Sequence, residues 1–235
     1  LRMLIAPGGS LGGARPKASV VDEFGQLWIA KFPSTRDDYD VGGWEFVVNA
    51  LAVNCGLRVA TGMARRYASD HHCFLVKRFD RTERGGRHHF ASAMTMTNRV
   101  DGDDASTGAS YLELAEVIME HGSEPNTDLR ELWSRIVFNI LCGNTDDHAR
   151  NHAAFWDGKS LALTPAFDLC PQLRTGQEAT QAMKIIGNAS NRLIRGTSTT
   201  SAHLGNLSIR RPLRKHPPSA GPMHAHPSVR GRGTP

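Results

Sequence analysis

Apolar and polar residues alternate in short blocks over the first third of the chain, which predicts a strand-rich region. Residues 18–21 and 27–32 are apolar runs on either side of a polar turn that begins at Asp22 and ends at Gly25. Two such runs around a short turn predict a β-hairpin. The glycine-dense residues 8–13 precede the hairpin and predict a flexible loop.

A longer apolar stretch follows the hairpin. Residues 44–55 are mostly apolar and are followed by Gly56, which predicts a helix with Asp40 as its N-terminal cap. Residues 58–67 and 72–79 predict two further strands. The first part of the chain is therefore expected to combine several strands with one helix.

The pattern becomes helical after a polar, glycine-rich stretch at residues 82–107. Ser110 and Glu113 have the spacing of a capping box and predict a helix that ends near His121. A second helix is expected to begin at Asn126, and its apolar residues predict one buried stripe: Leu129, Leu132, Trp133, Ile136, Val137, Ile140 and Leu141. Two short strands around Gly158 follow. Strands first and helices afterwards predict an α+β fold.

The composition excludes some classes of protein. No apolar run reaches the length of a membrane-spanning helix, and no secretory signal pattern opens the chain. The cysteines are widely spaced without a C-x-x-C pair, which argues against a zinc ribbon: Cys55, Cys73, Cys142 and Cys170. Each lies among apolar neighbours, so we expect reduced core thiols and a cytoplasmic protein.

Charge is distributed unevenly along the chain. The net charge is +5, but residues 1–178 carry 19 basic and 23 acidic side chains, and no acidic residue follows Glu178. Residues 196–235 are rich in proline and histidine and lack a helical or strand period. A basic arm for nucleic acid or a membrane surface would have this composition. A disordered extension without a specific role would have it too, and we expect the latter.

Three polar side chains in the helical part have the spacing of a phosphoryl-transfer centre. Asn151 follows Asp146 by five positions, and Asp168 comes after a short apolar strand. Protein kinases place a catalytic aspartate and a metal-binding asparagine at this interval, and an aspartate from the next strand and loop binds magnesium. Asp147 lies only four positions before Asn151, so the spacing favours Asp146 as the base.

Residues of the first part could complete such a centre. Lys31 ends an Ile-Ala-Lys run on a predicted strand, as does the nucleotide-contacting lysine of kinases. Glu45 on the next helix could pair with Lys31, although a solvent-exposed side chain is the simpler assumption for each. The glycine-dense loop could let backbone amides approach a phosphate, but it matches neither G-x-G-x-x-G nor the Walker pattern.

Two histidines near the aspartates suggest another chemistry. His148 and His152 are four positions apart, which on a helix would suit a metal ion. No glutamate follows His148 directly, so the zinc-protease motif is absent. We expect both histidines to form hydrogen bonds within their loop.

Five segments, in this order, carry a resemblance to a known family. They read SLGGARPK at residues 10–17, WIAKFP at 28–33, FLVKRFDR at 74–81, TDDHARN at 145–151 and LTPAFD at 163–168. Together they resemble the HipA family of bacterial serine/threonine kinases, the toxins of toxin–antitoxin pairs, over about residues 10–173. The resemblance implies a bilobal kinase-like fold and the use of ATP and magnesium to phosphorylate a protein hydroxyl.

The resemblance also implies roles for individual residues. Asp146 would be the catalytic base, Asn151 and Asp168 would hold magnesium, and Lys31 would contact the phosphates. The nucleotide would also meet the phosphate-binding loop and the interlobe hinge, at Gly12, Gly13, Val76, Lys77 and Phe79. Ser10 matches the serine that members autophosphorylate, which would switch the kinase off.

Partners are implied in the same way. Members usually bind a small DNA-binding antitoxin, HipB-like, which would bring this chain to DNA only indirectly. The best-known protein substrate in the family is a glutamyl-tRNA synthetase, so an aminoacyl-tRNA synthetase is one expected substrate. No membrane partner is expected.

The expected domains are a β-rich N-lobe at residues 1–79, a helical C-lobe at 80–195 and the tail at 196–235. The chain starts near the phosphate-binding loop and loses the resemblance after about Arg195, which predicts a missing N-terminal subdomain and an incomplete C-lobe. Two other functions stay open. One is an inactive remnant that binds an antitoxin or another protein. The other is a metal-dependent phosphohydrolase built on Asp146, Asp147, His148, His152 and Asp168.

Overall fold

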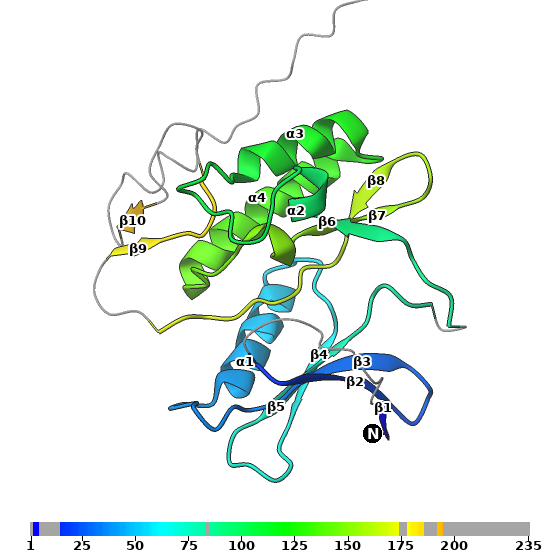
Figure 1. The fold of residues 1–235 in the computed structure, drawn as a ribbon, viewed down its shortest axis with the longest axis vertical. Coiled ribbons are helices and arrows are strands. Elements are labelled where there is room, and N and C mark those ends of the chain that lie inside the picture. Colours follow the sequence, from blue (N-terminus) through cyan, green and yellow to red (C-terminus); the bar gives the residue numbers. More distant parts are fainter. Residues whose placement is uncertain (1, 5–14, 83–84, 174–177, 186–191, 195–235) are drawn as a thin grey trace, which may run out of the picture.

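The protein, seen in a computed structural model, is described over residues 2–4, 15–82, 85–173, 178–185 and 192–194. Figure 1 shows a sheet with one helix on one side of the molecule, and a helix pair with a smaller sheet on the other. Ser10, Gly12, Gly13 and the expected tail lie outside the described residues. Within those residues, every helix is too short or too polar to cross a bilayer.

The larger sheet is antiparallel and has the strand order β1-β2-β3-β5-β4. Its strands are β1 (Arg2–Leu4), β2 (Lys17–Val21), β3 (Leu27–Lys31), β4 (Gly62–Arg65) and β5 (Cys73–Lys77). The predicted hairpin is confirmed as β2 and β3. The two later strands are also confirmed, although both are shorter than expected.

The hairpin turn is fixed by one side chain. Asp22 Oδ1 accepts hydrogen bonds from the backbone N–H groups of Phe24 (2.9 Å) and Gln26 (2.8 Å), and Gly25 has a φ of 77° that favours glycine. The sheet then buries one apolar face, made of Val20, Trp28, Ala30, Cys73 and Leu75.

Helix α1 (Val41–Asn54) packs against β4 and β5. Asp40 caps it by accepting a hydrogen bond from the N–H of Gly43 at 3.0 Å, as predicted, and the helix starts three residues earlier than expected. Gly42 allows close contact with the sheet, because a Cβ there would lie 2.1 Å from the carbonyl oxygen of His72.

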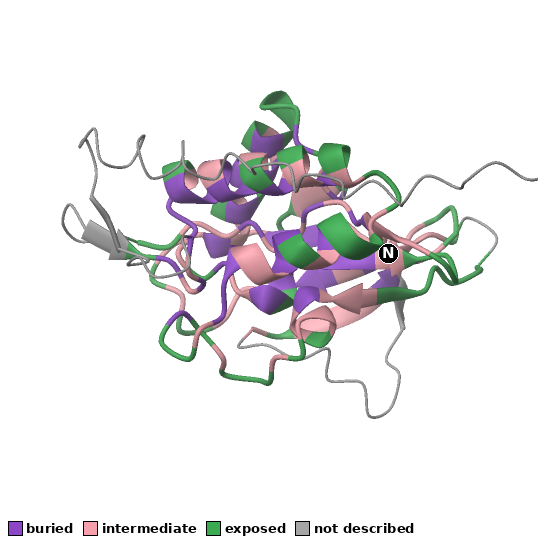
Figure 2. Ribbon diagram, turned by 90° about the horizontal axis from the view of Figure 1, so that it is seen from above, coloured by how far each residue is buried: buried purple, intermediate pink, exposed green. Residues whose placement is uncertain are grey.

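The second part is built around two helices, α3 (Tyr111–His121) and α4 (Pro125–Cys142). The capping box of Ser110 and Glu113 is present in full and confirms the predicted start of α3. Helix α4 ends at Gly143, which has a φ of 78°. The helices pack on each other and share one apolar cluster. Figure 2 shows buried and exposed stretches alternating along the helical ribbons.

The predicted stripe on α4 is only partly buried. Leu132, Ile136 and Ile140 are buried as expected, but Trp133 and Leu141 are 43% and 73% exposed. These two residues lie one position further around the helix, at the edge of the packed face. Two polar residues of α4, Arg135 and Asn139, are buried instead, and each is 1% exposed.

Several short elements complete the second part. The strands β6 (Phe90–Ser92), β7 (Ala153–Trp156) and β8 (Leu161–Leu163) form a sheet, which confirms the two strands around Gly158. The stretch 82–107 showed no regular pattern, yet it contains β6 and the short helix α2 (Ala93–Met96). The remaining elements are a 3-10 helix, η1 (Ala149–Asn151), and a strand pair, β9 (Glu178–Thr180) with β10 (Arg192–Ile194).

An apolar cluster joins the two parts. It contains Val48 and Ala52 from α1, Phe138 from α4, and Ala166 and Leu169 on either side of Asp168. The segment that carries Asp168 is therefore seated between the two parts of the molecule. The domain boundaries at residues 79 and 195 stay predictions.

The cysteine prediction is partly wrong. All four cysteines are free, but Cys55 is exposed at the end of α1, and only Cys73 is fully buried. Apolar neighbours in the sequence misled the prediction here, because the helix end that carries Cys55 faces solvent.

Candidate active site

Lys31 lies between two carboxylates. It is the last residue of β3, and its Nζ forms ion pairs with Glu45 of α1 and with Asp168 after β8. Lys31 is 9% exposed and Glu45 is 3% exposed. The simpler assumption of solvent-exposed side chains is therefore wrong for both residues. Three distant segments of the sequence meet at this group.

The charges of the group are strongly coupled. Burial alone would lower the pKa of Lys31, but the negative charges of Glu45 and Asp168 raise it above its ordinary value. Burial raises the pKa of Glu45 despite the attraction of Lys31. Burial also acts to raise the pKa of Asp168, yet the charge and hydrogen bond of Lys31 dominate and lower it. The Lys31 ammonium therefore faces a charged Asp168 carboxylate.

Asp168 has an unusual backbone conformation. Its φ is 60°, in the left-handed region that side chains other than glycine rarely adopt. The preceding segment is held by backbone hydrogen bonds: Ala60 N–H donates to Ala166 O (2.9 Å), and Ala166 N–H donates to Arg58 O (2.7 Å). The side chain remains 36% exposed. Strained residues of this kind cluster at functional sites.

Asp146 and Asp147 follow the end of α4 in a loop. Asp147 is fully buried, and its Oδ2 accepts hydrogen bonds from Tyr111 Oη (2.7 Å) and Asn139 Nδ2 (2.8 Å) and contacts His152 Nε2 at 3.0 Å. Burial acts to raise the pKa of Asp147, but the charge of His152 and these hydrogen bonds lower it. Asp146 is exposed. Asp147 therefore anchors the loop, and Asp146 is the accessible carboxylate.

Asn151 supports the Asp146 loop directly. Its Nδ2 donates a hydrogen bond to the backbone carbonyl of Asp146 at 3.1 Å, and its backbone N–H donates to His148 O at 2.9 Å. The Asn151 side chain is almost fully buried. The Asp146 loop and Asn151 thus form one hydrogen-bonded unit.

The histidines do not form a metal pair. His148 precedes η1 and His152 follows it, so the two residues do not share a helix face. His152 is bound to Asp147, as expected of a hydrogen-bonding histidine. Among the described residues, no group of three His, Cys, Asp or Glu side chains is arranged to hold a metal ion.

The expected hinge lies at the end of β5. Lys77 N–H donates to Thr61 O (2.8 Å), and Val76 pairs with Ile29 of β3 and Gly62 of β4. The Phe79 ring contacts three other rings, with centroid distances of 5.8 Å, 5.9 Å and 5.4 Å to Phe90, Phe155 and Phe167. Phe167 precedes Asp168, so Phe79 at the expected hinge and the Asp168 segment are packed together.

The sequence analysis did not predict the roles of some residues of the site. Tyr111 and Asn139 hold Asp147, and Phe90, Phe155 and Phe167 surround Phe79. A tyrosine after a capping box or an asparagine within a helix carries no local signal for such a role. Only the proximity of distant segments in the fold shows it.

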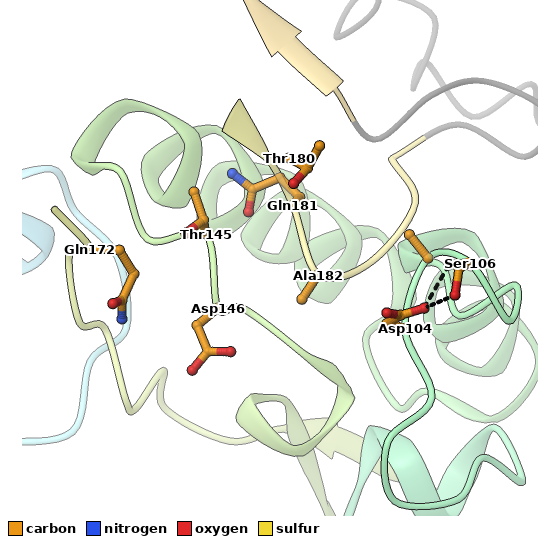
Figure 3. Close-up of a pocket in the computed structure, with 9 residues that line it drawn as sticks. Asp104, Ser106, Thr145, Asp146, Gln172, Thr180, Gln181 and Ala182 are labelled. Carbon is orange, nitrogen blue, oxygen red and sulfur yellow. Dashed lines mark hydrogen bonds between the residues drawn. The ribbon is translucent and has the colours of Figure 1, made fainter. Parts of the chain in front are cut away.

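A cavity of about 560 Å³ opens beside Asp146 (Figure 3). It is bounded by four segments: the loop before α3, the Asp146 loop, Gln172 in the segment after Asp168, and residues 180–182 at the end of β9 and beyond it. Asp146 is one of the residues that line this cavity, and the close-up shows it next to Thr145. Lys31, Glu45 and Asp168 are not among the residues that line it.

The family described as HipA-like C-terminal domain matches residues 9–215. The chain belongs to this family. The HipA-like chain is 25% identical to "Putative kinase Y4mE" of Sinorhizobium fredii over an alignment of 155 residues, which covers 60% of this chain and 33% of that protein. The resemblance predicted from the five motifs is therefore confirmed.

Two solved structures share the fold of the HipA-like chain. One is HipA in the Shewanella oneidensis complex of HipA, HipB and operator DNA, with a TM-score of 0.69 and 20% identity over 86% of this chain and 53% of that one. The other is the proinflammatory kinase CtkA of Helicobacter pylori, with a TM-score of 0.56 and 21% identity over 72% of this chain and 57% of that one. The predicted α+β class is confirmed.

Proposed function

We propose that this HipA-like chain is the catalytic part of a serine/threonine protein kinase, which transfers the γ-phosphate of ATP to a protein hydroxyl. The observation that carries the proposal is the pairing of Lys31 with both Glu45 and Asp168. Protein kinases need an ion pair between a strand lysine and a helix glutamate, together with a metal-binding aspartate, to hold the nucleotide. Membership of the HipA-like family supports the same activity.

Lys31 would bind the α- and β-phosphates. Glu45 fixes the position of the ammonium, and the raised pKa of Lys31 keeps it charged at neutral pH. A fixed positive charge in a site with little water interacts strongly with phosphate oxygens. Gly12 and Gly13 would add backbone amides from the phosphate-binding loop, as the sequence predicts.

Asn151 and Asp168 fit a magnesium ion. One oxygen of Asp168 binds Lys31, and the Nδ2 of Asn151 donates to Asp146 O, so Asp168 Oδ2 and Asn151 Oδ1 are the atoms that would hold the metal. Magnesium prefers such oxygens and commonly takes one or two protein ligands together with phosphates. When bound, the ion would neutralise charge on the β- and γ-phosphates.

Asp146 would act as the catalytic base. Its carboxylate is accessible and lines the cavity, whereas Asp147 is buried and occupied by three partners. The base would orient the acceptor hydroxyl and receive its proton during transfer. The hydrogen bond from Asn151 to the backbone of Asp146 would keep the base in place.

Adenine would lie at the hinge. The backbone of Val76 and Lys77 would border it, and the Phe79 ring, which is fixed by three aromatic neighbours, would lie against its face. Ser10 would be the autophosphorylation site that switches the kinase off. These roles rest on the family motifs.

We also propose the partners that the family implies. A HipB-like antitoxin would bind the whole protein and bring it to DNA indirectly, and an aminoacyl-tRNA synthetase would be one protein substrate. The similarity to HipA in its complex with HipB and operator DNA supports the antitoxin. A toxin–antitoxin module in the cytoplasm would be the biological setting.

An inactive protein-binding remnant is the second candidate. It is supported by apolar side chains exposed on α1, where Trp44, Val47 and Leu51 are 54%, 43% and 48% exposed. Contiguous apolar surface of this kind often marks a protein contact. A remnant would leave the ion pairs of Lys31 intact and would bind no nucleotide.

Thermal unfolding with ATP and magnesium tests the proposed function. We expect ATP with magnesium to raise the Tm of the chain, because a ligand that binds only the folded state stabilises it. The variant Asp168→Asn should show much less of this increase, and the control Glu120→Gln, at an exposed position on α3, should keep it. Equal increases in all three proteins, or none in the wild type, would contradict the proposal.

A further inference from the structure

Helix α4 carries a row of charged residues that the proposed mechanism does not use. Asp128, Glu131 and Arg135 stand three and four positions apart, so they lie on one face of the helix. Asp128 and Arg135 are only 2% and 1% exposed. Buried charges are costly unless they are paired, so the contacts of this charged row indicate what it holds in place.

The charged row binds the backbone of the segment that leads to Asp168. Asp128 Oδ2 accepts a hydrogen bond from the N–H of Leu163 at 2.9 Å, and Arg135 Nη2 donates to the carbonyl oxygen of Thr164 at 2.7 Å. Leu163 and Thr164 are both buried. Two neighbouring residues of this segment are therefore held by side chains of α4.

The same row binds the part of the chain that follows α1. Arg58 Nη2 pairs with Asp128 Oδ1 at 2.6 Å, and the backbone N–H of Arg58 donates to Glu131 Oε1 at 3.2 Å. Arg135 Nε donates to the same Glu131 oxygen at 2.8 Å, and its Nη2 also lies 3.4 Å from the carbonyl oxygen of Arg58. That carbonyl accepts the N–H of Ala166 at 2.7 Å. Arg135 thus contacts two backbone segments that are hydrogen-bonded to each other.

Few backbone rotations are free between Thr164 and Asp168. The ring of Pro165 fixes its φ, and Ala166 is hydrogen-bonded through both its N–H and its carbonyl oxygen. The Phe167 ring is packed against the aromatic group at the expected hinge. A displacement of Thr164 would therefore be passed on to Asp168.

We infer that Arg135 is a positioning residue for the magnesium site, because it fixes where Asp168 stands relative to Lys31. It acts through two backbone segments, one that leads to Asp168 and one that follows α1, the helix of Glu45. The inference rests on the proposed function. Replacing buried ion pairs by apolar side chains is often neutral or stabilising, so stability alone does not explain a guanidinium at this place.

Calorimetric titration with ATP tests this role by a quantity that loss of folded protein does not change. The Kd for ATP is measured with excess magnesium and again with EDTA. The ratio of the two Kd values gives the gain in affinity that magnesium provides. A smaller folded fraction weakens both Kd values by the same factor, so it cancels in the ratio.

Two substitutions of Arg135 should reduce the magnesium-dependent gain. Arg135→Met removes the bond to Thr164, and Arg135→Lys keeps the charge but offers one nitrogen in place of a fork that spans Glu131 and Thr164. We expect the gain to fall by about tenfold in Arg135→Met and by about threefold in Arg135→Lys, as for loss of an indirect support of a metal ligand. Arg130→Met, at an exposed position on the same helix, should keep the wild-type gain.

The outcomes separate this inference from the proposed function. A wild type with a magnesium-dependent gain that both Arg135 variants keep would overturn the inference alone. An Arg135→Lys chain that does not fold would also overturn it, since Arg135 would then be needed for the fold itself. A wild type that binds no ATP in either condition would overturn the proposed function and this inference with it.

Discussion

Asp146 and Asp147 are adjacent in the sequence, but their carboxylates lie in opposite environments. Asp147 is 2% exposed and is bound by Tyr111, Asn139 and His152, whereas Asp146 is exposed at the edge of a cavity. The Asp147 carboxylate holds the loop to the helices, and the Asp146 side chain is open to solvent. The two adjacent aspartates therefore have different structural roles.

Asparagine substitutions should separate these two roles. Asp147→Asn should lower the free energy of unfolding by about 1–3 kcal/mol, because buried donors lose a charged acceptor. Asp146→Asn should leave stability almost unchanged and reduce phosphate transfer by roughly 10²–10⁴-fold, as for a general base. Urea unfolding and transfer of labelled phosphate measure the two effects. A large loss of stability in Asp146→Asn would contradict the division of roles.

Replacing Lys31 by methionine should make stability depend on pH. The variant leaves Glu45 buried without its cation, and burial already raises the pKa of Glu45. A carboxyl whose folded-state pKa is raised destabilises the protein as pH rises towards that pKa. Lys31→Met should therefore be closer to wild-type stability at pH 5.5 than at pH 8, with a loss at pH 8 below the about 3–5 kcal/mol of a fully unpaired buried charge.

The control for Lys31→Met is Lys159→Met in the turn between β7 and β8. Chemical unfolding at the two pH values measures the free energy of unfolding for each variant. The control should match the wild type at both. A Lys31→Met chain that is equally destabilised at pH 5.5 and pH 8 would show that Glu45 does not take up a proton.

Acid should weaken the wild type partly through Asp147. Its pKa is lower in the folded protein than the ordinary value of 3.8, so the stability it contributes is present above that value and is lost as pH falls through the folded-state pKa. The free energy of unfolding should fall less steeply below pH 3.8 in Asp147→Asn than in the wild type. Parallel acid limbs in the two proteins would contradict this account.

Phe79→Ala should weaken both the fold and the nucleotide site. The ring contacts three aromatic neighbours, so its removal should lower the free energy of unfolding by about 2–4 kcal/mol. ATP should also raise the Tm of the variant less. Phe24→Ala is the matched control, since Phe24 is 80% exposed in the hairpin turn and should change stability by less than about 0.5 kcal/mol. Similar losses in both variants would argue against the aromatic hinge.

Local signals predicted much of the fold. The hairpin follows from two apolar runs around Asp22, and the starts of α1 and α3 follow from their caps at Asp40 and Ser110. Each of these features is decided within a few residues of the chain. The exposure of Trp133 and Leu141 was missed, because a helical pattern gives the packed face but not its width.

The site was predictable only in part. The spacing of Asp146 and Asn151 suggested their relationship, and the structure joins them by a hydrogen bond. The meeting of Lys31 with Asp168 bridges 137 residues of sequence and was expected only from the family resemblance. Tyr111 and the other partners of Asp147 could not be predicted, because contacts between distant segments depend on how the whole chain packs.

At Asp168 the backbone and the side chain have conflicting requirements, because the left-handed backbone conformation is unfavourable for a residue that carries a side chain. Glycine would adopt this conformation without strain, so Asp168→Gly would be expected to relieve backbone energy. The same change would also remove the carboxylate that faces Lys31. The gain in backbone energy and the loss of the ion pair would oppose each other, so the measured stability of Asp168→Gly would show which of the two effects is larger at this position.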